Sequence, residues 1–288
     1  MDRKKLIASI IMIGAVALLL VLTLGGKKEQ PATGFAAYRV VAHAMGGIHD
    51  STYTNSLDAF IANYEQGTRV FEADLLLTSD NKLVARHEWT ANMSKLLGQQ
   101  TVLPADKQGT VLSYEEVMDS PILEIYSPLD IDKIMNLLVI YPDAYLVTDT
   151  KELEPEKVTK QFQLIVEAAE KRDPALLQRI VPQVYSRDMR DVVNQVYAFP
   201  EMIFTLYQTQ DSDETVIEFV KQTGVDITMP TTRATKSFVR KLTNAGARVY
   251  VHTVNDEEEI RELSRMGVNG FYTDFVSEND LNLIKGVR

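Results

Sequence analysis

Residues 38–89 carry the pattern that decides the fold, and they read YRVVAHAMGGIHDSTYTNSLDAFIANYEQGTRVFEADLLLTSDNKLVARHEW. Near the middle of this stretch, Glu72 and Asp74 lie two residues apart in a run of strand-forming residues. Side chains at i and i+2 of a strand point to the same face, so the two carboxylates should project together. Like charges at this spacing repel, and a site that keeps both ionised usually holds a cation or accepts hydrogen bonds.

A histidine ends the apolar run on each side of this pair. His43 follows residues 40–42, and His87 follows residues 83–86. Two carboxylates between two histidines predict a combined metal and acid–base site. The alternative is a half-buried hairpin whose polar residues are incidental, because short motifs also occur by chance.

Short runs rich in Val, Ile, Tyr and Phe recur along the chain and predict strands, and segments with helical periodicity separate them. The predicted strands are 39–44, 70–77, 144–150, 180–185, 202–208, 226–230, 248–254 and 270–274, and the predicted helices are 55–66, 130–140, 155–171, 187–197, 213–223, 234–245 and 256–266. Eight strands alternating with helices over about 250 residues favour a parallel α/β fold, and the count favours a TIM (β/α)₈ barrel over an open doubly wound sheet. No GxGxxG motif or P-loop follows the first strand, which argues against nucleotide binding.

Residues 87–120 interrupt this alternation. They include Gly98 and Pro104 and show poor periodicity, so we expect a loop-like insertion after the second strand. In a barrel, such an insertion lies at the face that carries the active site. Among the helix starts, Asn55 and Asn255 are predicted as N-caps.

The N-terminus carries a separate signal. Residues 1–5 are a short basic segment, and residues 6–24 form an apolar run without a charge. Nineteen residues at about 1.5 Å each span a hydrocarbon core of about 30 Å, so we expect one transmembrane anchor, with a cleaved signal peptide as the alternative. Residues 25–37 are then a tether and residues 38–288 the globular domain. The expected location is the cell membrane, with the domain outside the cytoplasm.

The composition limits the classes of partner and cofactor. The net charge is −10, and basic residues do not cluster outside the N-terminus, so nucleic acid is not an expected partner. The chain has no cysteine, which excludes disulfides, thiolate nucleophiles and sulfur-ligated zinc. A phosphate ligand stays open, because local cations or a bound metal decide its binding rather than the net charge.

Polar residues also follow later predicted strands, at the end where a barrel carries its catalytic groups. Asp149 and Lys151 end the third run with the same i, i+2 spacing, and Gln183 and His252 end two others. A lone histidine near an apolar run is more often a hydrogen-bonded structural residue, and this is the default for His252 and for His49 in its polar turn. The recurrence of polar residues at the same strand end nevertheless predicts one shared site.

Together these motifs resemble the glycerophosphodiester phosphodiesterase family, whose barrel is related to that of the phosphatidylinositol-specific phospholipase C enzymes. The family shows His-Arg-Gly, Glu-Asn-Thr, Glu-x-Asp, His-Asp, Glu-x-Lys, Trp-Thr-Val-Asn, Gly-Val-Asp-Gly and Thr-Asp in this order. The matching segments here are 43–47, 54–56, 72–74, 87–88, 149–151, 252–255, 267–270 and 273–274. The resemblance covers nearly all of residues 38–280. It implies a TIM barrel and a divalent-metal phosphodiesterase.

The chain departs from the family pattern at four positions. Ala44 replaces the arginine expected to contact phosphate, and Thr54 replaces the glutamate of Glu-Asn-Thr. Asp149 is one methylene shorter than the family glutamate, and His252 replaces the family tryptophan. These departures concern the substrate more than the fold.

The residues and the resemblance together predict the roles within the site. His43 and His87 are the expected acid and base, since imidazole titrates near neutral pH. Glu72, Asp74 and Asp149 form an all-oxygen site suited to Ca²⁺ or Mg²⁺. The candidates for contact with phosphate or the rest of the substrate are Lys151, Arg86, Asn55, Gln183 and His252.

We therefore expect a metal-dependent phosphodiesterase that hydrolyses a glycerophosphodiester or a related glycerol-phosphate or phosphoinositide compound. Its partner would be a phosphodiester small molecule or a lipid headgroup. The main alternative is a catalytically degenerate barrel that binds phospho-glycans or lipid headgroups, which Ala44 favours and the retained histidines and carboxylates oppose. A metal-dependent aldolase or isomerase would need a Schiff-base lysine in a desolvated pocket, and Lys151 among acids fits that poorly.

Overall fold

The computed structural model describes residues 33–284 and 286, and the chain from Gly34 onward forms one compact unit. The predicted basic segment, the predicted transmembrane anchor and most of the predicted tether (1–5, 6–24 and 25–32) lie outside the described residues. Within the described part of the chain, no helix is both long enough and apolar enough to cross a membrane.

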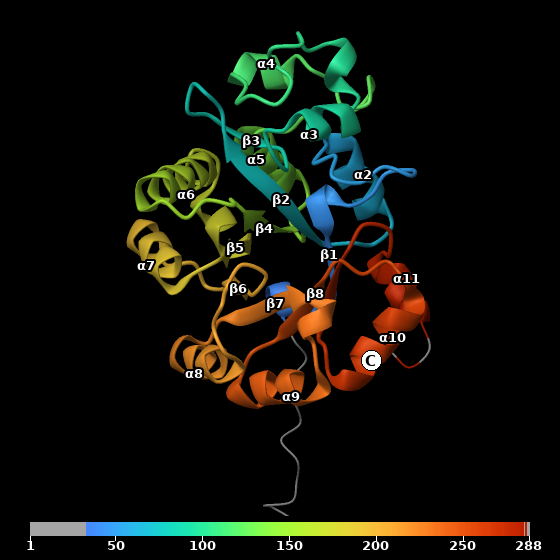
Figure 1. Ribbon diagram of the computed structural model, residues 1–288, viewed down its shortest axis with the longest axis vertical. Helices are drawn as coiled ribbons and strands as arrows, with labels where there is room; N and C mark the ends of the chain where they lie inside the picture. Colours follow the sequence, from blue (N-terminus) through green and yellow to red (C-terminus); the bar gives the residue numbers. More distant parts are fainter. Residues whose placement is uncertain (1–32, 285, 287–288) are drawn as a thin grey trace, which may run out of the picture. The chain divides into compact units, whose positions relative to one another are not determined.

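Within residues 33–284, eight parallel strands close into a barrel, which confirms the predicted TIM-barrel fold. Neighbours along the chain pair with one another, and β1 pairs with both β2 and β9, which closes the ring (Figure 1). The strands are β1 (Val40–Ala42), β2 (Val70–Leu77), β4 (Tyr145–Asp149), β5 (Ile180–Val184), β6 (Ile203–Thr205), β7 (Asp226–Pro230), β8 (Val249–His252) and β9 (Gly270–Thr273). All eight fall within the predicted runs, because buried parallel strands need continuous apolar, β-branched segments.

A helix follows each barrel strand along the chain, and these helices surround the barrel (Figure 1). They are α2 (Leu57–Glu65), α5 (Ile131–Ile140), α6 (Pro155–Glu170), α7 (Arg187–Val196), α8 (Asp213–Thr223), α9 (Lys236–Ala245), α10 (Glu257–Met266) and α11 (Glu278–Leu283). The longer of these helices bury an apolar stripe at helical spacing, as Val158, Phe162 and Ile165 do in α6.

The insertion after β2 contains more regular structure than the sequence suggests. Before it, β3 (Leu83–Ala85) pairs antiparallel with the end of β2. Within it lie α3 (Ala91–Leu96), the 3₁₀ helix η3 (Gln99–Thr101) and α4 (Tyr114–Met118), beyond the β2–β3 hairpin (Figure 1). The loop-like prediction is therefore wrong here. Helices of five or six residues make fewer than two turns, so they leave no detectable periodicity.

The interior of the barrel has an apolar layer at its N-terminal end. Phe35, in the 3₁₀ helix η1 (Gly34–Ala37), is buried among inward-facing residues of the strands such as Val41 and Val147. Its ring stacks on Tyr250 with a centroid separation of 5.5 Å. Residues 34–37, assigned to the tether from sequence, thus pack against the barrel. The polar residues at the strand ends meet at the opposite, C-terminal end.

Candidate active site

A cavity of about 430 Å³ opens at the C-terminal ends of the barrel strands. Its wall includes seven of the ten site residues predicted from sequence: His43, Glu72, His87, Asp149, Lys151, Gln183 and His252. The barrel therefore brings together side chains that are up to about 200 residues apart in the chain, as expected for this fold.

Glu72 and Asp149 line this cavity, and the fully buried Asp74 lies next to them, with one oxygen from each of the three within 4.8 Å of the others. Glu72 and Asp74 share a face of β2, and the parallel register pairs Asp74 with Asp149 of β4. Glu72 Oε1 and Asp149 Oδ1 are buried without a hydrogen-bond partner among the described residues. Such oxygens are costly to bury, and their convergence is the donor set that Ca²⁺ or Mg²⁺ prefers. The residues present therefore fit a divalent cation.

Burial changes the acidity of these carboxylates in different ways. Burial and the neighbouring charge of Asp74 raise the pKa of Glu72 to about 8. Burial also raises the pKa of Asp149. Burial acts on Asp74 in the same direction, but the Lys151 ammonium outweighs it, with help from the histidines, and the pKa of Asp74 is lowered. A divalent cation would favour the ionised form of all three.

Lys151 binds two of the carboxylates at once. Its Nζ lies 2.7 Å from Asp74 Oδ1 and 2.8 Å from Asp149 Oδ2. The backbone of Lys151 is left-handed, with a φ of 54°, which is uncommon outside glycine. In this conformation the Lys151 side chain points back toward Asp74 of β2 and Asp149 of β4. Lys151 thus offsets part of the repulsion within the carboxylate cluster.

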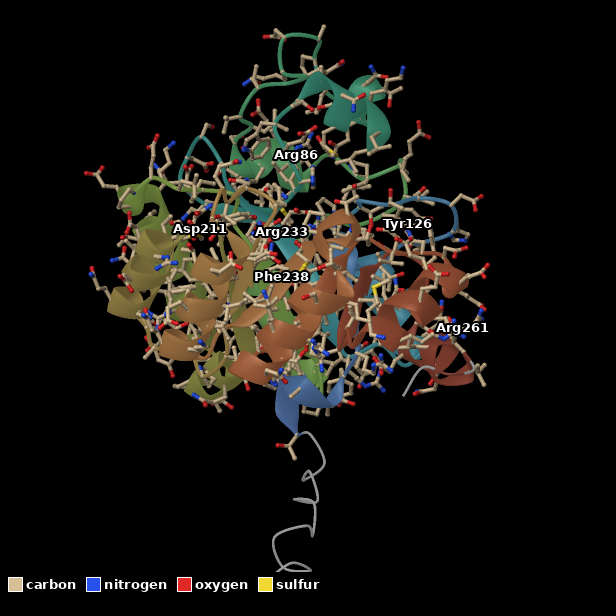
Figure 2. The ribbon with its side chains drawn as sticks, turned by 60° about the horizontal axis from the view of Figure 1, so that its bottom comes forward. Arg86, Tyr126, Asp211, Arg233, Phe238 and Arg261 are labelled. Atoms are coloured by element: carbon tan, nitrogen blue, oxygen red, sulfur yellow. The ribbon has the colours of Figure 1, made fainter. Side chains whose placement is uncertain are left out.

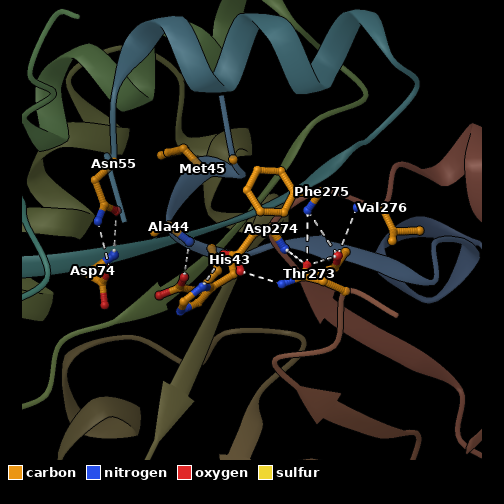
Figure 3. Close-up of polar contacts among 12 residues, drawn as sticks. His43, Ala44, Met45, Asn55, Asp74, Thr273, Asp274, Phe275 and Val276 are labelled. Atoms are coloured by element: carbon orange, nitrogen blue, oxygen red, sulfur yellow. Dashed lines mark hydrogen bonds and ion pairs between the residues drawn. The ribbon is translucent and has the colours of Figure 1, made fainter. Parts of the chain in front are cut away.

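Two asparagines hold two aspartates by the same pair of hydrogen bonds. Asn55 donates from Nδ2 to Asp74 Oδ2 at 2.8 Å and accepts from the Asp74 backbone N–H at 3.0 Å (Figure 3). Asn255 likewise donates from Nδ2 to Asp274 Oδ2 at 2.8 Å and accepts from the Asp274 backbone N–H at 2.7 Å. In both pairs the asparagine precedes the aspartate by 19 residues. Each pair fixes a carboxylate at a strand end.

The prediction that these two asparagines cap helices is wrong. Ser56 caps α2 and Asp256 caps α10, each accepting a hydrogen bond from a backbone N–H in the first turn. The Asn55 and Asn255 amides are instead occupied by the neighbouring strand ends. Adjacent polar residues look equally suitable as caps in a sequence, and only the contact across strands distinguishes them.

His43 and His87 lie against the same aromatic ring. The ring centroid of Tyr53 is 4.9 Å from that of His43 and 4.7 Å from that of His87, both in edge-to-face geometry. His43 Nδ1 lies 2.9 Å from Asp274 Oδ1, which leaves Nε2 for the cavity (Figure 3).

The two histidines have opposite electrostatic surroundings. Burial lowers the pKa of His43, but the hydrogen bond with Asp274 and the charge of Glu72 outweigh it and raise the pKa to about 9. Burial lowers the pKa of His87, and Asp74 only partly compensates. The His87 Nδ1 atom is buried without a partner among the described residues. The surroundings therefore favour the protonated form of His43 and the neutral form of His87.

The backbone of Ala44, not its side chain, serves the carboxylate cluster. The Ala44 N–H donates to Glu72 Oε2 at 2.7 Å (Figure 3). Ala44 and the following Met45 are both left-handed, with φ of 50° and 69°. The Ala44 side chain is fully buried and is not part of the cavity wall. The position expected to hold an arginine thus supplies only a backbone hydrogen bond.

Gln183 and His252 line the cavity, as predicted for substrate contacts. Gln183 accepts a hydrogen bond from the Tyr272 hydroxyl at 2.9 Å. His252 Nδ1 lies 3.0 Å from Thr228 Oγ1. Burial lowers the pKa of His252 to about 4, with the charges of His43 and Lys151 acting in the same direction, so its ring is neutral at neutral pH.

Three predicted site residues are not part of the cavity wall: the metal-ligand candidate Asp74, which is fully buried beside it, and the substrate-contact candidates Arg86 and Asn55. Arg86 is 3% exposed, and its guanidinium donates to Glu88, Gln99 and Ser94 at the base of the insertion (Figure 2). Burial lowers its pKa to about 10. Asn55 is fully buried behind Asp74. Substrate contact by either residue stays a prediction, and their present bonds position other parts of the site.

Sequence reasoning assigned no role to Asp274 or Tyr53. Asp274 directly follows β9, the same kind of position that drew attention to Asp149, so the strand-end rule could have found it. Tyr53 lies in an irregular loop with a φ of 60°, where no periodic pattern marks a residue. Only the tertiary structure shows that this loop reaches the histidines.

Comparison with known proteins agrees with this geometry. The sequence profile of the glycerophosphoryl diester phosphodiesterase family matches residues 44–278. A search of curated proteins finds no match.

Several solved structures have a similar fold. A glycerophosphodiester phosphodiesterase from Parabacteroides distasonis has a TM-score of 0.68 at 18% identity and covers 85% of this chain and 96% of its own. A phosphodiesterase from Oleispira antarctica, solved in complex with the product sn-glycerol-3-phosphate, has a TM-score of 0.68 at 14% identity, with 85% and 96% covered. A glycerophosphodiester phosphodiesterase from Thermotoga maritima has a TM-score of 0.63 at 19% identity, with 85% and 97% covered. At these identities the likeness shows the shared barrel.

The family assignment itself rests on the profile match, which spans most of the chain. The matched segment includes the carboxylate cluster, His87, Lys151 and Asp274. With the cavity at the C-terminal face of a barrel, sequence and structure lead to one conclusion. The chain belongs to the glycerophosphoryl diester phosphodiesterase family and is a phosphoric diester hydrolase.

Proposed function

We propose that this enzyme is a metal-dependent phosphodiesterase that hydrolyses a glycerophosphodiester or a related glycerol-phosphate compound, with His43 and His87 as its acid–base pair. The observation that carries the proposal is a cluster of three buried carboxylates, two of which line one cavity together with two histidines. A glycerol-phosphate substrate is supported by the Oleispira antarctica enzyme, whose structure contains the product sn-glycerol-3-phosphate.

The chemistry needs three things from the site. These are a base for the attacking hydroxyl, an acid for the leaving oxygen and positive charge at the phosphoryl oxygens. One histidine takes the proton of the attacking hydroxyl, and the other gives a proton to the alcohol oxygen as its bond to phosphorus breaks. The attacking hydroxyl comes from water or from the substrate itself, in which case a cyclic phosphate forms first and water then opens it.

Glu72, Asp74 and Asp149 would hold the metal, which we propose to be Ca²⁺ or Mg²⁺. When bound, the cation supplies positive charge to the phosphoryl oxygens. Lys151 keeps two of the carboxylates in place and adds a fixed positive charge beside them. Asp274 orients His43 by holding Nδ1, so that Nε2 exchanges the proton with the substrate.

We also propose that residues 6–24 anchor the enzyme in the cell membrane, with the barrel outside the cytoplasm. The support is the uninterrupted apolar run itself, which is long enough to cross a hydrocarbon core of about 30 Å. A lipid-derived substrate would suit an enzyme held at this surface.

The histidine pair makes a direct prediction for activity. His43→Ala and His87→Ala should each lower kcat/KM on glycerophosphocholine by about 10²- to 10⁴-fold, because each removes one proton-transfer group. A choline-release assay measures this. The matched control is His49→Ala, since His49 is an exposed residue hydrogen-bonded to Tyr126 and should leave activity unchanged. Full turnover in either active-site variant would contradict the mechanism.

The carboxylate cluster predicts a dependence on divalent cations. EDTA should abolish turnover and lower Tm, because the carboxylates repel one another without a cation. Readdition of Ca²⁺ or Mg²⁺ should restore both and identify the metal. Glu72→Gln should remove most of the metal-dependent rise in Tm, whereas Glu65→Gln, at an exposed carboxylate of α2, should retain it. Undiminished turnover in EDTA would rule the metal out.

The metal-free protein should show an unusual titration of His43. Its pKa is raised to about 9, because the Asp274 hydrogen bond and the Glu72 charge outweigh burial. A pKa raised on folding adds stability that is complete below about pH 6.5 and is lost as the pH rises through 9. Asp274→Asn should move the NMR titration of His43 toward pH 6.5 and remove this component of stability. Asp191→Asn, at an exposed carboxylate, should change neither; an unmoved His43 titration in Asp274→Asn would refute the account.

The proposed anchor predicts where the protein fractionates. Deletion of residues 1–32 should release the enzyme from the membrane fraction to the soluble fraction, because the apolar run is removed. The specific activity on glycerophosphocholine should stay unchanged. Continued sedimentation of the shortened protein with membranes would contradict the anchor.

A further inference from the structure

The cavity has few positive groups for a phosphodiester. Among the described residues of its wall, Lys151 is the only lysine or arginine, and it is already paired with two carboxylates. Ala44 offers no side chain to the cavity, and Arg86 bonds elsewhere. The non-bridging phosphoryl oxygens therefore need other hydrogen-bond donors from this chain.

Tyr53 occupies the position from which such a donor can act. Its ring makes edge-to-face contact with both His43 and His87, at 4.9 and 4.7 Å between centroids, and it lines the cavity. In a phosphoryl transfer the attacking and leaving oxygens lie roughly in line, with the three other oxygens around the equator. If His43 and His87 transfer protons at the attacking and leaving oxygens, a group that contacts both histidines lies beside the three equatorial oxygens of the phosphoryl group.

The Tyr53 hydroxyl is free for this contact. Three tyrosines line the cavity wall within the described chain. The Tyr272 hydroxyl donates to Gln183. The Tyr207 hydroxyl accepts from Gln208, and the Tyr207 ring packs against Tyr185 and His252 rather than against His43 or His87. The Tyr53 hydroxyl makes no hydrogen bond with any residue in 33–284, and its side chain is only partly buried.

The loop holds Tyr53 in place despite an unfavourable backbone. Tyr53 has a φ of 60°, a left-handed conformation that bulky residues rarely adopt. The segment is held on both sides, by the paired residues Ile48 and Ser51 and by the bond from Asn55 N–H to the Ala44 carbonyl at 3.0 Å. The second bond ties the chain two residues after Tyr53 to the backbone of Ala44. Strain of this kind persists where the surrounding structure requires one conformation.

We propose that Tyr53 contacts the substrate, and that its hydroxyl donates a hydrogen bond to a non-bridging phosphoryl oxygen of the bound phosphodiester. This inference rests on the proposed function, because it places a phosphodiester in the cavity. Burial and the charges of Asp274 and Asp74 raise the pKa of Tyr53, so the hydroxyl keeps its proton at neutral pH and can donate it in a hydrogen bond.

Tyr53→Phe tests the proposal, because it removes the hydroxyl and keeps the ring between the histidines. A hydrogen bond to a charged group corresponds to a loss of about 10- to 100-fold in kcat/KM on glycerophosphocholine. The Kd of inorganic phosphate for the Ca²⁺- or Mg²⁺-loaded enzyme, measured by calorimetry, should rise by about tenfold. Metal affinity and Tm should match the wild type. The matched control is Tyr197→Phe, whose hydroxyl accepts a hydrogen bond from Gln178 away from the cavity and should change none of these values.

Two outcomes separate this inference from the proposed function. If Tyr53→Phe stays within twofold of the wild type in both phosphate Kd and kcat/KM, the contact is wrong even though the enzyme is a phosphodiesterase. If the wild type cleaves no diester but Tyr53→Phe still weakens phosphate binding, the proposed function fails and the Tyr53 contact is supported. A wild type that neither binds phosphate nor cleaves a diester overturns both.

Discussion

The mutual repulsion of three buried carboxylates is the main physical constraint on the C-terminal end of this barrel, where the cavity lies. Glu72, Asp74 and Asp149 are brought within 4.8 Å by strand register, which leaves them no room to separate. The surrounding contacts offset part of this repulsion. Lys151 bridges Asp74 and Asp149, Asn55 also holds Asp74, and the Ala44 backbone N–H holds Glu72. Glu72 Oε1 and Asp149 Oδ1 have no hydrogen-bond partner among the described residues, and such carboxylate oxygens are suitable ligands for a divalent cation.

The same pair of asparagine–aspartate hydrogen bonds occurs twice in the site, with two different roles. Asn55 fixes Asp74, which belongs to the carboxylate cluster, while Asn255 fixes Asp274, which holds a histidine. In each case the amide binds both the carboxylate and the backbone N–H of one residue, so the carboxylate cannot rotate freely. Ala44 contributes only its backbone N–H to the carboxylate cluster, and its side chain is not part of the cavity wall.

Particular elements show how much of this could be predicted. The barrel strands were predicted because buried parallel strands are continuous apolar runs, and the Glu72–Asp74 pair because strand geometry alone sets i, i+2 on one face. Helices α3 and α4 were not predicted, because they are shorter than two turns and leave no detectable periodicity. Arg86 was predicted as a candidate cation for phosphate, yet its guanidinium donates hydrogen bonds to Gln99 and Ser94 of the insertion.

The sequence by itself determined the repeating strand–helix units, the carboxylate pair and the histidines that end their runs, because these follow from local periodicity and strand geometry. The tertiary structure alone decided which distant residues meet. It placed Asp274 on His43 and the Tyr53 ring against both histidines, and it turned Asn55 and Asn255 from apparent helix caps into supports for carboxylates. The physical reason is that barrel closure sets contacts across strands, whereas propensity and spacing describe only neighbours along the chain.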